Sequence, residues 1–105
     1  MANLQDKVSQ GVSVSDFDQI KLDPTVVGVI VGTDYNLSML KICEAANYIT
    51  KNGAELIGTN VDRTDGKDRL RPSGGSLIKI VQAAAGNPPL TVIGKPDTFC
   101  FNLLL

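Results

Sequence analysis

Three short polar segments carry the side chains best suited to hold a ligand. Each follows an apolar stretch: Thr33 and Asp34 follow the first, Asn60 and Asp62 the second, and Lys95 the third. Ligands of open parallel sheets bind beyond the carboxyl ends of the strands. If the apolar stretches are neighbouring parallel strands, these carboxylate, amide and ammonium groups meet along one edge of a sheet.

Lys95 lies between Gly94 and Pro96, directly after the third apolar stretch. A glycine permits a tight backbone and a proline fixes the exit angle, so the lysine is held at a defined place. Its ammonium group is a compact point charge that can neutralise a phosphate or a carboxylate. The alternative interpretation is a solvated lysine in a turn.

Asn60 and Asp62 open a polar segment that extends to residue 73. Their short side chains can donate to or accept from a ligand, or they can form the Asx-turns that begin a loop. The segment mixes both charge signs, with Arg63 among the basic residues, which favours a solvated loop over an anion trap. It also lacks the terminal glutamate of a calcium-binding loop.

Several kinds of catalytic and metal site are excluded by residue type. The sequence has no histidine, and its two cysteines, Cys43 and Cys100, are not in a Cys-x-x-Cys pair. A zinc site, a Cys–His nucleophile and a Ser-His-Asp triad are therefore not expected, and we predict no metal ligands in this chain. The Gly74-Gly75-Ser76 segment suits an anion, but it lacks the lysine of a P-loop.

The bulk composition narrows the class of protein. The 105 residues are 43% hydrophobic with a formal net charge of −1, as in one globular domain without a basic tract for nucleic acid. No apolar run approaches the roughly 18 residues of a membrane helix. The N-terminal residues lack the charged-then-apolar pattern of a signal peptide, so we expect a cytoplasmic protein that binds neither nucleic acid nor membrane.

The apolar pattern alternates between strand and helix. Continuous β-branched stretches predict buried strands, and apolar residues at helical spacing predict helices. The expected elements are a short helix over 2–10, strands over 26–31, 55–59 and 90–93, helices over 37–52 and 74–84, and a helix beginning near 98. Right-handed crossovers between such strands predict a three-layer α/β fold, with helices on both faces of a mostly parallel sheet.

The last seven residues, 99–105, include six apolar ones. Such a segment needs a surface to cover, so we expect it either to dock on this domain or to pack on a surface outside this chain. On this interpretation the chain ends within a fold, and its chemistry is completed by residues that it does not contain.

Four ordered motifs resemble the haloacid-dehalogenase-type phosphatases, in the branch with 4-nitrophenylphosphatase, phosphoglycolate phosphatase and the NagD-like proteins. They are Val-Val-Gly-Val-Ile-Val-Gly-Thr-Asp, Gly-Thr-Asn-Val-Asp, Arg-Leu-Arg-Pro-Ser-Gly-Gly-Ser-Leu and Val-Ile-Gly-Lys-Pro, within residues 24–101. The resemblance implies that residues 1–93 are an α/β cap, which covers the active site and selects the substrate. Residues 94–105 would begin the returning catalytic core, which is incomplete here.

The resemblance also implies roles for individual residues. Lys95 matches the lysine that steadies the nucleophile and the phosphoryl group, while Asn60 and Asp62, with Arg63, match the start of the substrate-facing loop. The implied protein is a magnesium-dependent phosphomonoester phosphatase that acts on small phosphorylated metabolites or p-nitrophenyl phosphate. Its partners would be that substrate, the missing catalytic core and, in a possible homodimer, a second copy.

The sequence departs from the family at points that matter for catalysis. It lacks the Asp-x-Asp-Gly nucleophile motif and the later acidic motif that holds magnesium, and it reads Pro72-Ser73-Gly74-Gly75 where the family has Pro-Gly-x-Gly. We therefore expect this chain to be inactive alone, with no cofactor of its own. The alternatives are a non-catalytic module that binds a small anion and a dimerisation module.

Overall fold

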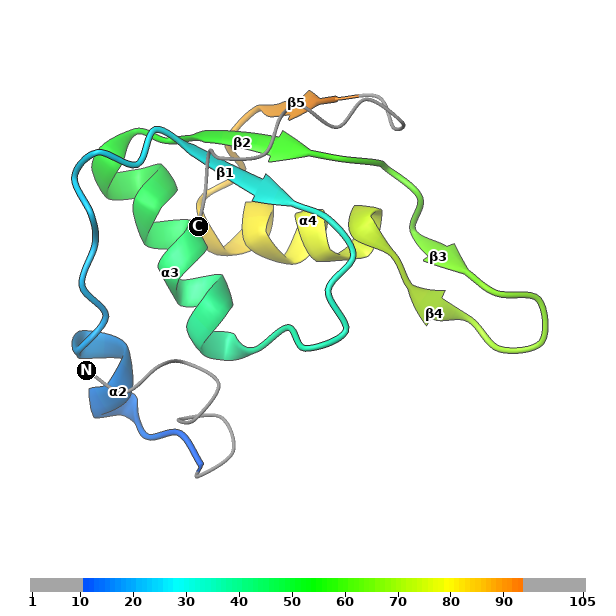
Figure 1. Ribbon diagram of the computed structural model, residues 1–105, viewed down its shortest axis with the longest axis horizontal. Coiled ribbons are helices and arrows are strands. Elements are labelled where there is room, and N and C mark those ends of the chain that lie inside the picture. The colour runs from blue at the N-terminus through cyan, green and yellow to red at the C-terminus, as the bar shows by residue number, and fades with distance from the viewer. Residues whose placement is uncertain (1–10, 94–105) are drawn as a thin grey trace.

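The computed structural model describes residues 11–93 as alternating helices and strands (Figure 1). The elements in order are α2 (Val14–Asp18), β1 (Gly28–Val31), α3 (Met39–Asn52), β2 (Glu55–Gly58), β3 (Thr64–Asp65), β4 (Arg71–Pro72), α4 (Gly74–Ala84) and β5 (Leu90–Val92). The expected strands and helices between residues 26 and 93 are all found. The predictions for 2–10, for 98 onward and for the apolar segment 99–105 lie outside the described residues.

The three longer strands form one parallel sheet in the order β1-β2-β5. Val29 is level with Leu56, and Leu56 is level with Leu90. The α/β class with a parallel sheet is thus confirmed, and the three strands end at the same edge, as the placement of the polar segments requires.

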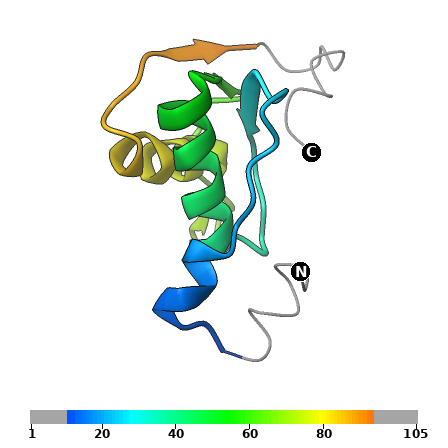
Figure 2. The same cartoon turned by 90° about the vertical axis from the view of Figure 1, so that its left-hand side faces the viewer.

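Both helices that follow these strands, α3 and α4, lie on the same face of the sheet (Figure 2). Each crossover moves one strand further in the same direction, from β1 to β2 and from β2 to β5. Right-handed crossovers in one direction place their helices on one side, and a second helical layer needs a reversal of strand order. Within residues 11–93 the fold is therefore a sheet with one helical layer, where the sequence had predicted helices on both faces.

The ends of α3 follow from local chemistry. The Ser38 hydroxyl accepts a hydrogen bond from the Lys41 backbone N–H at 3.2 Å and so caps the first turn. Gly53 ends the helix with φ of 70°, a left-handed conformation that favours glycine. The helix buries one apolar face against the sheet, which includes Leu40, Ala45 and Ile49.

The core lies between the sheet and the two helices. Val29 and Leu56 point into it from β1 and β2, and Ile78 and Val81 from α4, and all four side chains are buried. Gly58 on β2 allows this packing, since a Cβ there would lie 2.5 Å from Ile78 Cδ1. Burial of these apolar side chains is the main source of stability for so short a chain.

The segment before β1 is fastened to the last turns of α3. The Asp23 backbone N–H donates to the Tyr48 hydroxyl at 3.0 Å. The Asn52 side-chain amide donates to the carbonyls of Asp23 and Val26 at 2.9 and 3.2 Å. These bonds fix the direction in which the chain enters the sheet.

Two features were not predicted from the sequence. Val14–Asp18 form the short helix α2, and its N-cap Ser13 belongs to a capping box in which the Ser13 N–H donates to Asp16 Oδ2 at 2.9 Å. The segment 60–73, expected to be a loop throughout, contains the antiparallel pair β3–β4. Strands of two residues are too short to give a periodic signal.

Replacing Leu56 by alanine should lower the free energy of unfolding by about 2–5 kcal/mol, because it opens a cavity in the core. Leu56 is 1% exposed, while Leu70, which serves as the matched control, is 75% exposed. Leu70→Ala should change stability by less than about 0.5 kcal/mol. Urea unfolding followed by circular dichroism measures both, and equal effects would contradict the placement of β2 at the centre of the core.

Candidate functional site

The ends of β1 and β2 and the start of α4 meet at the carboxyl edge of the sheet. The Thr33 and Ser73 hydroxyl oxygens are 3.4 Å apart, within hydrogen-bonding distance. Gly32 lies against the residue that follows β2, since a Cβ at Gly32 would be 2.8 Å from Thr59 Oγ1. The structure thus brings together two of the three predicted polar segments. Lys95, in the third, lies outside the described residues.

Asn60 shapes the beginning of the predicted substrate-facing segment. Its Oδ1 accepts a hydrogen bond from the Asp62 backbone N–H at 3.0 Å, the Asx-turn that the sequence left open as the alternative. Its amide also lies against α4, since a Cβ at Gly74 would be 2.9 Å from Asn60 Nδ2. The structure therefore assigns Asn60 a structural contact, and its binding to a ligand stays a prediction.

Backbone groups of Asp62 and Arg63 hold this segment against the first turn of α4. The Asp62 carbonyl accepts from the Gly75 N–H at 2.8 Å, and the Arg63 carbonyl accepts from the Ser73 N–H at 3.0 Å. The Ser76 hydroxyl donates to the same Arg63 carbonyl at 2.5 Å. Because the main chain is fixed in this way, the exposed Arg63 side chain projects from a rigid base.

Beyond Arg63 the chain forms a hairpin that projects from the body of the domain (Figure 1). Thr64 is level with Pro72 and Asp65 with Arg71, and Arg71 Nε is 2.8 Å from Asp65 Oδ1. The sequence predicted that the charged side chains of this segment are solvated, and they are exposed in the structure. The Asp65–Arg71 pair joins the two strands of the hairpin. The hairpin carries several basic side chains away from the sheet.

The Pro72-Ser73-Gly74-Gly75 segment has a definite shape despite its departure from the family pattern. Ser73 is extended, with φ of −114° and ψ of −176°, and occupies the N-cap position of α4. Ser73 is buried, with only 5% of its surface exposed. Gly75 is needed for close approach, since a Cβ there would lie 2.6 Å from the Asp62 carbonyl oxygen. The two glycines therefore serve packing between helix and loop.

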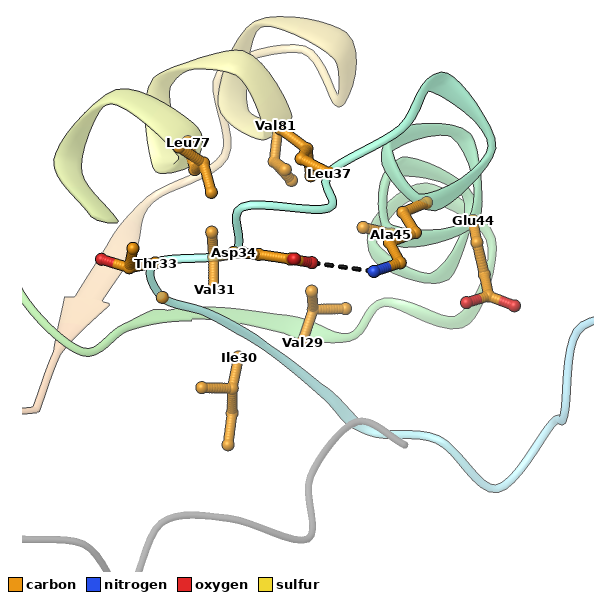
Figure 3. Close-up of a pocket in the computed structure, with 12 residues that line it drawn as sticks. Val29, Ile30, Val31, Thr33, Asp34, Leu37, Glu44, Ala45, Leu77 and Val81 are labelled. Atoms are coloured by element: carbon orange, nitrogen blue, oxygen red, sulfur yellow. Dashed lines mark hydrogen bonds and ion pairs between the residues drawn. The ribbon is translucent and has the colours of Figure 1, made fainter. Parts of the chain in front are cut away.

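Asp34 is turned toward α3. Its Oδ2 lies 2.9 Å from Lys41 Nζ, and its Oδ1 accepts from the Asn36 backbone N–H at 2.8 Å (Figure 3). The bond from Lys41 holds the pKa of the Asp34 carboxyl below its ordinary value of 3.8, and Asn36 adds to this effect. The sequence did not predict that Lys41 pairs with Asp34, because Lys41 lies on the following helix, where a lysine is common.

A cavity of about 390 Å³ runs beside β1, between this strand and the two helices (Figure 3). Val29, Val31, Ala45, Leu77 and Val81 give it an apolar floor, and Thr33, Asp34, Lys41 and Glu44 are the polar side chains that line it. Burial raises the pKa of the Glu44 carboxyl above its ordinary value of 4.5. Sequence reasoning missed the cavity because it forms between elements distant along the chain.

The described residues do not supply a magnesium site. No group of three or more histidine, cysteine or acidic residues lies close enough together within residues 11–93 to hold a metal ion. Magnesium binds through several oxygen ligands, usually carboxylates with substrate phosphate, so no step of a reaction is assigned to the ion here. Among the same residues no helix has the length and apolarity needed to cross a bilayer.

The chain is similar in sequence and in structure to known phosphatases. The chain is 34% identical over 96 residues to glycerol-3-phosphate phosphatase of Gallus gallus, covering 88% of this chain and 30% of that protein. It is 35% identical over 86 residues to chronophin of Rattus norvegicus, with 78% and 27% covered. The solved p-nitrophenylphosphatase (NPPase) of Geobacillus stearothermophilus, a double mutant, superposes with a TM-score of 0.61 at 31% identity, with 72% and 29% covered.

The chain belongs to the haloacid-dehalogenase-type phosphatases. A hypothetical protein of Pyrococcus horikoshii superposes with a TM-score of 0.62 at 33% identity, over 89% of this chain and 31% of that one. No protein-family model matches the sequence. This member spans about 30% of the length of the curated relatives it matches, as the first of them shows.

Replacing Gly75 by alanine should destabilise the domain by about 1–3 kcal/mol, because the new methyl group meets backbone atoms that cannot turn aside. Gly74→Ala is the matched control, since its methyl group would meet the Asn60 side-chain amide, which can move. Thermal unfolding compares the two variants. A larger loss for Gly74→Ala would contradict the proposed contact between α4 and the loop.

Asp34→Asn and Glu44→Gln should change stability in opposite directions at neutral pH. The lowered pKa of Asp34 means that its carboxylate stabilises the fold above pH 3.8, and this is lost as pH falls through its folded pKa. The Asp34–Lys41 pair is part-exposed, so Asp34→Asn should cost at most about 1 kcal/mol. The raised pKa of Glu44 means that its ionised form opposes folding, so Glu44→Gln should stabilise.

Urea unfolding of both variants between pH 3 and pH 8 provides the measurement. Both differences from the unmodified chain should shrink toward acid pH, where both carboxyl groups become protonated in folded and unfolded states. A stabilising Asp34→Asn substitution at neutral pH would show that the ion pair with Lys41 does not form.

Proposed function

We propose that the chain is the substrate-covering cap of a magnesium-dependent phosphomonoester phosphatase. In this proposal residues 1–93 form the cap and residues 94–105 begin the returning catalytic core. Two facts support it: the chain is similar to about 30% of the length of a glycerol-3-phosphate phosphatase, and its 105 residues lack an Asp-x-Asp-Gly motif. The nucleophile would then come from polypeptide outside this sequence.

The observation that carries this proposal is the anchored base of the β3–β4 hairpin. Three hydrogen bonds from the first turn of α4 hold the carbonyls of Asp62 and Arg63 at the carboxyl edge of the sheet. A cap must place its substrate contacts to within a fraction of an ångström of the reacting atoms, because small misplacement costs much of the rate. A rigid base under an exposed arginine meets that requirement.

The roles of individual residues follow from their chemistry. Arg63 would contact the phosphate or another anionic group of the substrate through its planar guanidinium, with Asn60 and Asp62 setting the loop that carries it. Lys95 would steady the nucleophile and the phosphoryl group as a point charge. The cap itself would exclude water and orient the substrate over the catalytic core.

The substrate class in this proposal is a small phosphorylated metabolite, with p-nitrophenyl phosphate as an artificial substrate. The protein would act in the cytoplasm, with the catalytic core as its main partner and a second copy as a possible one. Neither nucleic acid nor membrane is a proposed partner, because the net charge of −1 provides no attraction to either.

A chimera tests the cap assignment directly. Residues 24–93 would replace the matching segment of the Geobacillus stearothermophilus p-nitrophenylphosphatase. The chimera should hydrolyse p-nitrophenyl phosphate with magnesium, and Arg63→Ala should lower its kcat/KM by about tenfold or more through loss of a charge-assisted bond to substrate. Arg69→Ala is the matched control, since Arg69 is an exposed arginine on the same hairpin.

The chain by itself sets the baseline for this experiment. It should show no magnesium-dependent turnover above that of its Lys95→Ala variant, because a lysine cannot replace the aspartate nucleophile. Clear turnover that Lys95→Ala abolishes would contradict the proposal. Equal losses in Arg63→Ala and Arg69→Ala chimeras would show that Arg63 has no specific place at the substrate.

A further inference from the structure

The cavity beside β1 is separate from the anchored hairpin and is not used in the proposed phosphatase function. It is lined by β1, by the loop that follows it, and by side chains of α3 and α4. Its volume of about 390 Å³ lies within the roughly 300–1,000 Å³ range of pockets that hold small molecules. Its volume is therefore sufficient for a small ligand.

The floor of the cavity is apolar. Val29 and Val31 point into it from β1, while Ile30 points to the opposite side of the strand (Figure 3). Ala45 closes it from α3, and Leu77 and Val81 close it from α4. A ligand in contact with this floor must present a hydrocarbon body, because the floor offers no side-chain hydrogen-bonding group.

The charges that line the cavity do not balance. Lys41 is neutralised by Asp34 at 2.9 Å, and Asp34 is further satisfied by the Asn36 N–H. Glu44 extends from α3 apart from this pair (Figure 3). Within residues 11–93 no hydrogen bond or ion pair to the Glu44 carboxylate is found, although the side chain is partly buried. The net charge of the three groups is therefore one negative unit, located on Glu44.

We propose that this cavity binds a small organic cation, with an ammonium group at Glu44 and an apolar body on the floor formed by Val29, Val31 and Val81. Charge complementarity selects the cation, since an ammonium ion supplies Glu44 with a partner that it does not have among residues 11–93. Burial raises the pKa of the Glu44 carboxyl, because the ionised form loses solvation, and a bound cation would offset this loss. A neutral ligand would leave that loss in place, and an anion would add repulsion.

The test uses the full 105-residue chain and three probes of similar size: 2-phenylethylammonium, neutral 2-phenylethanol and anionic phenylacetate. Amide and methyl NMR shifts are followed during each titration. The ammonium probe should produce saturable shifts at Val29, Val31, Ala45 and Val81, with an affinity about tenfold higher than that of the alcohol, the increment expected for a charge-assisted bond. Phenylacetate should bind more weakly than either.

Glu44→Gln should reduce the affinity for the ammonium probe to that for the alcohol. Glu55→Gln is the matched control, because Glu55 accepts a hydrogen bond from Thr91 at 2.6 Å and does not line the cavity. It should leave all three affinities unchanged. The probe comparison on the unmodified chain stands even if a variant fails to fold.

Three results would overturn the proposal. One is equal affinity of the unmodified chain for the ammonium and the alcohol, or preference for phenylacetate. Another is the absence of saturation, or shifts that lie away from the cavity. The third is a change of the same resonances with protein concentration alone, because a second copy of the chain would then fill the cavity.

Discussion

Parallel pairing of β2 with both of its neighbours is the constraint from which the rest of the arrangement follows. The Glu55 N–H donates to Val27 and the Thr59 N–H to Val31, at 3.0 and 3.2 Å, and the Ile93 N–H donates to Gly58 at 2.9 Å. These bonds set the register of the sheet. Because all three strands run the same way, the polar residues that follow β1 and β2 emerge at one edge, and both crossover helices pack on one face.

At that edge the packing of α4 against the loop decides the shape of the candidate site. The glycine pair at the start of α4 lets the helix approach the backbone of residues 61–63 closely, and the helix N–H groups are satisfied by loop carbonyls. An anion would compete for the same donors. In the sequence, the double glycine resembles an anion-binding helix start. In the structure, it instead allows α4 to contact the base of the hairpin closely.

In the proposed function, the chain is a domain that positions a substrate and leaves the chemical step to other polypeptide. The described residues offer an anchored hairpin with exposed basic groups, and they offer no cluster of carboxylates for a metal ion. In a phosphatase that forms a covalent aspartyl intermediate, these two tasks can be separated, since the cap only has to orient the substrate and exclude water. The cavity at Glu44 is a separate feature, between β1 and the helices α3 and α4.

The sequence by itself determined the α/β class, the three parallel strands, both long helices and the family. Each depends on local signals: β-branched runs, helical spacing ended by Gly53, and motifs in a fixed order. Tertiary structure alone decided that Asn60 turns back on Asp62, that Asp34 pairs with Lys41, and that one face of the sheet carries both helices. These outcomes depend on contacts between segments far apart in sequence, or on a choice between equally favourable hydrogen bonds, and no local pattern encodes either.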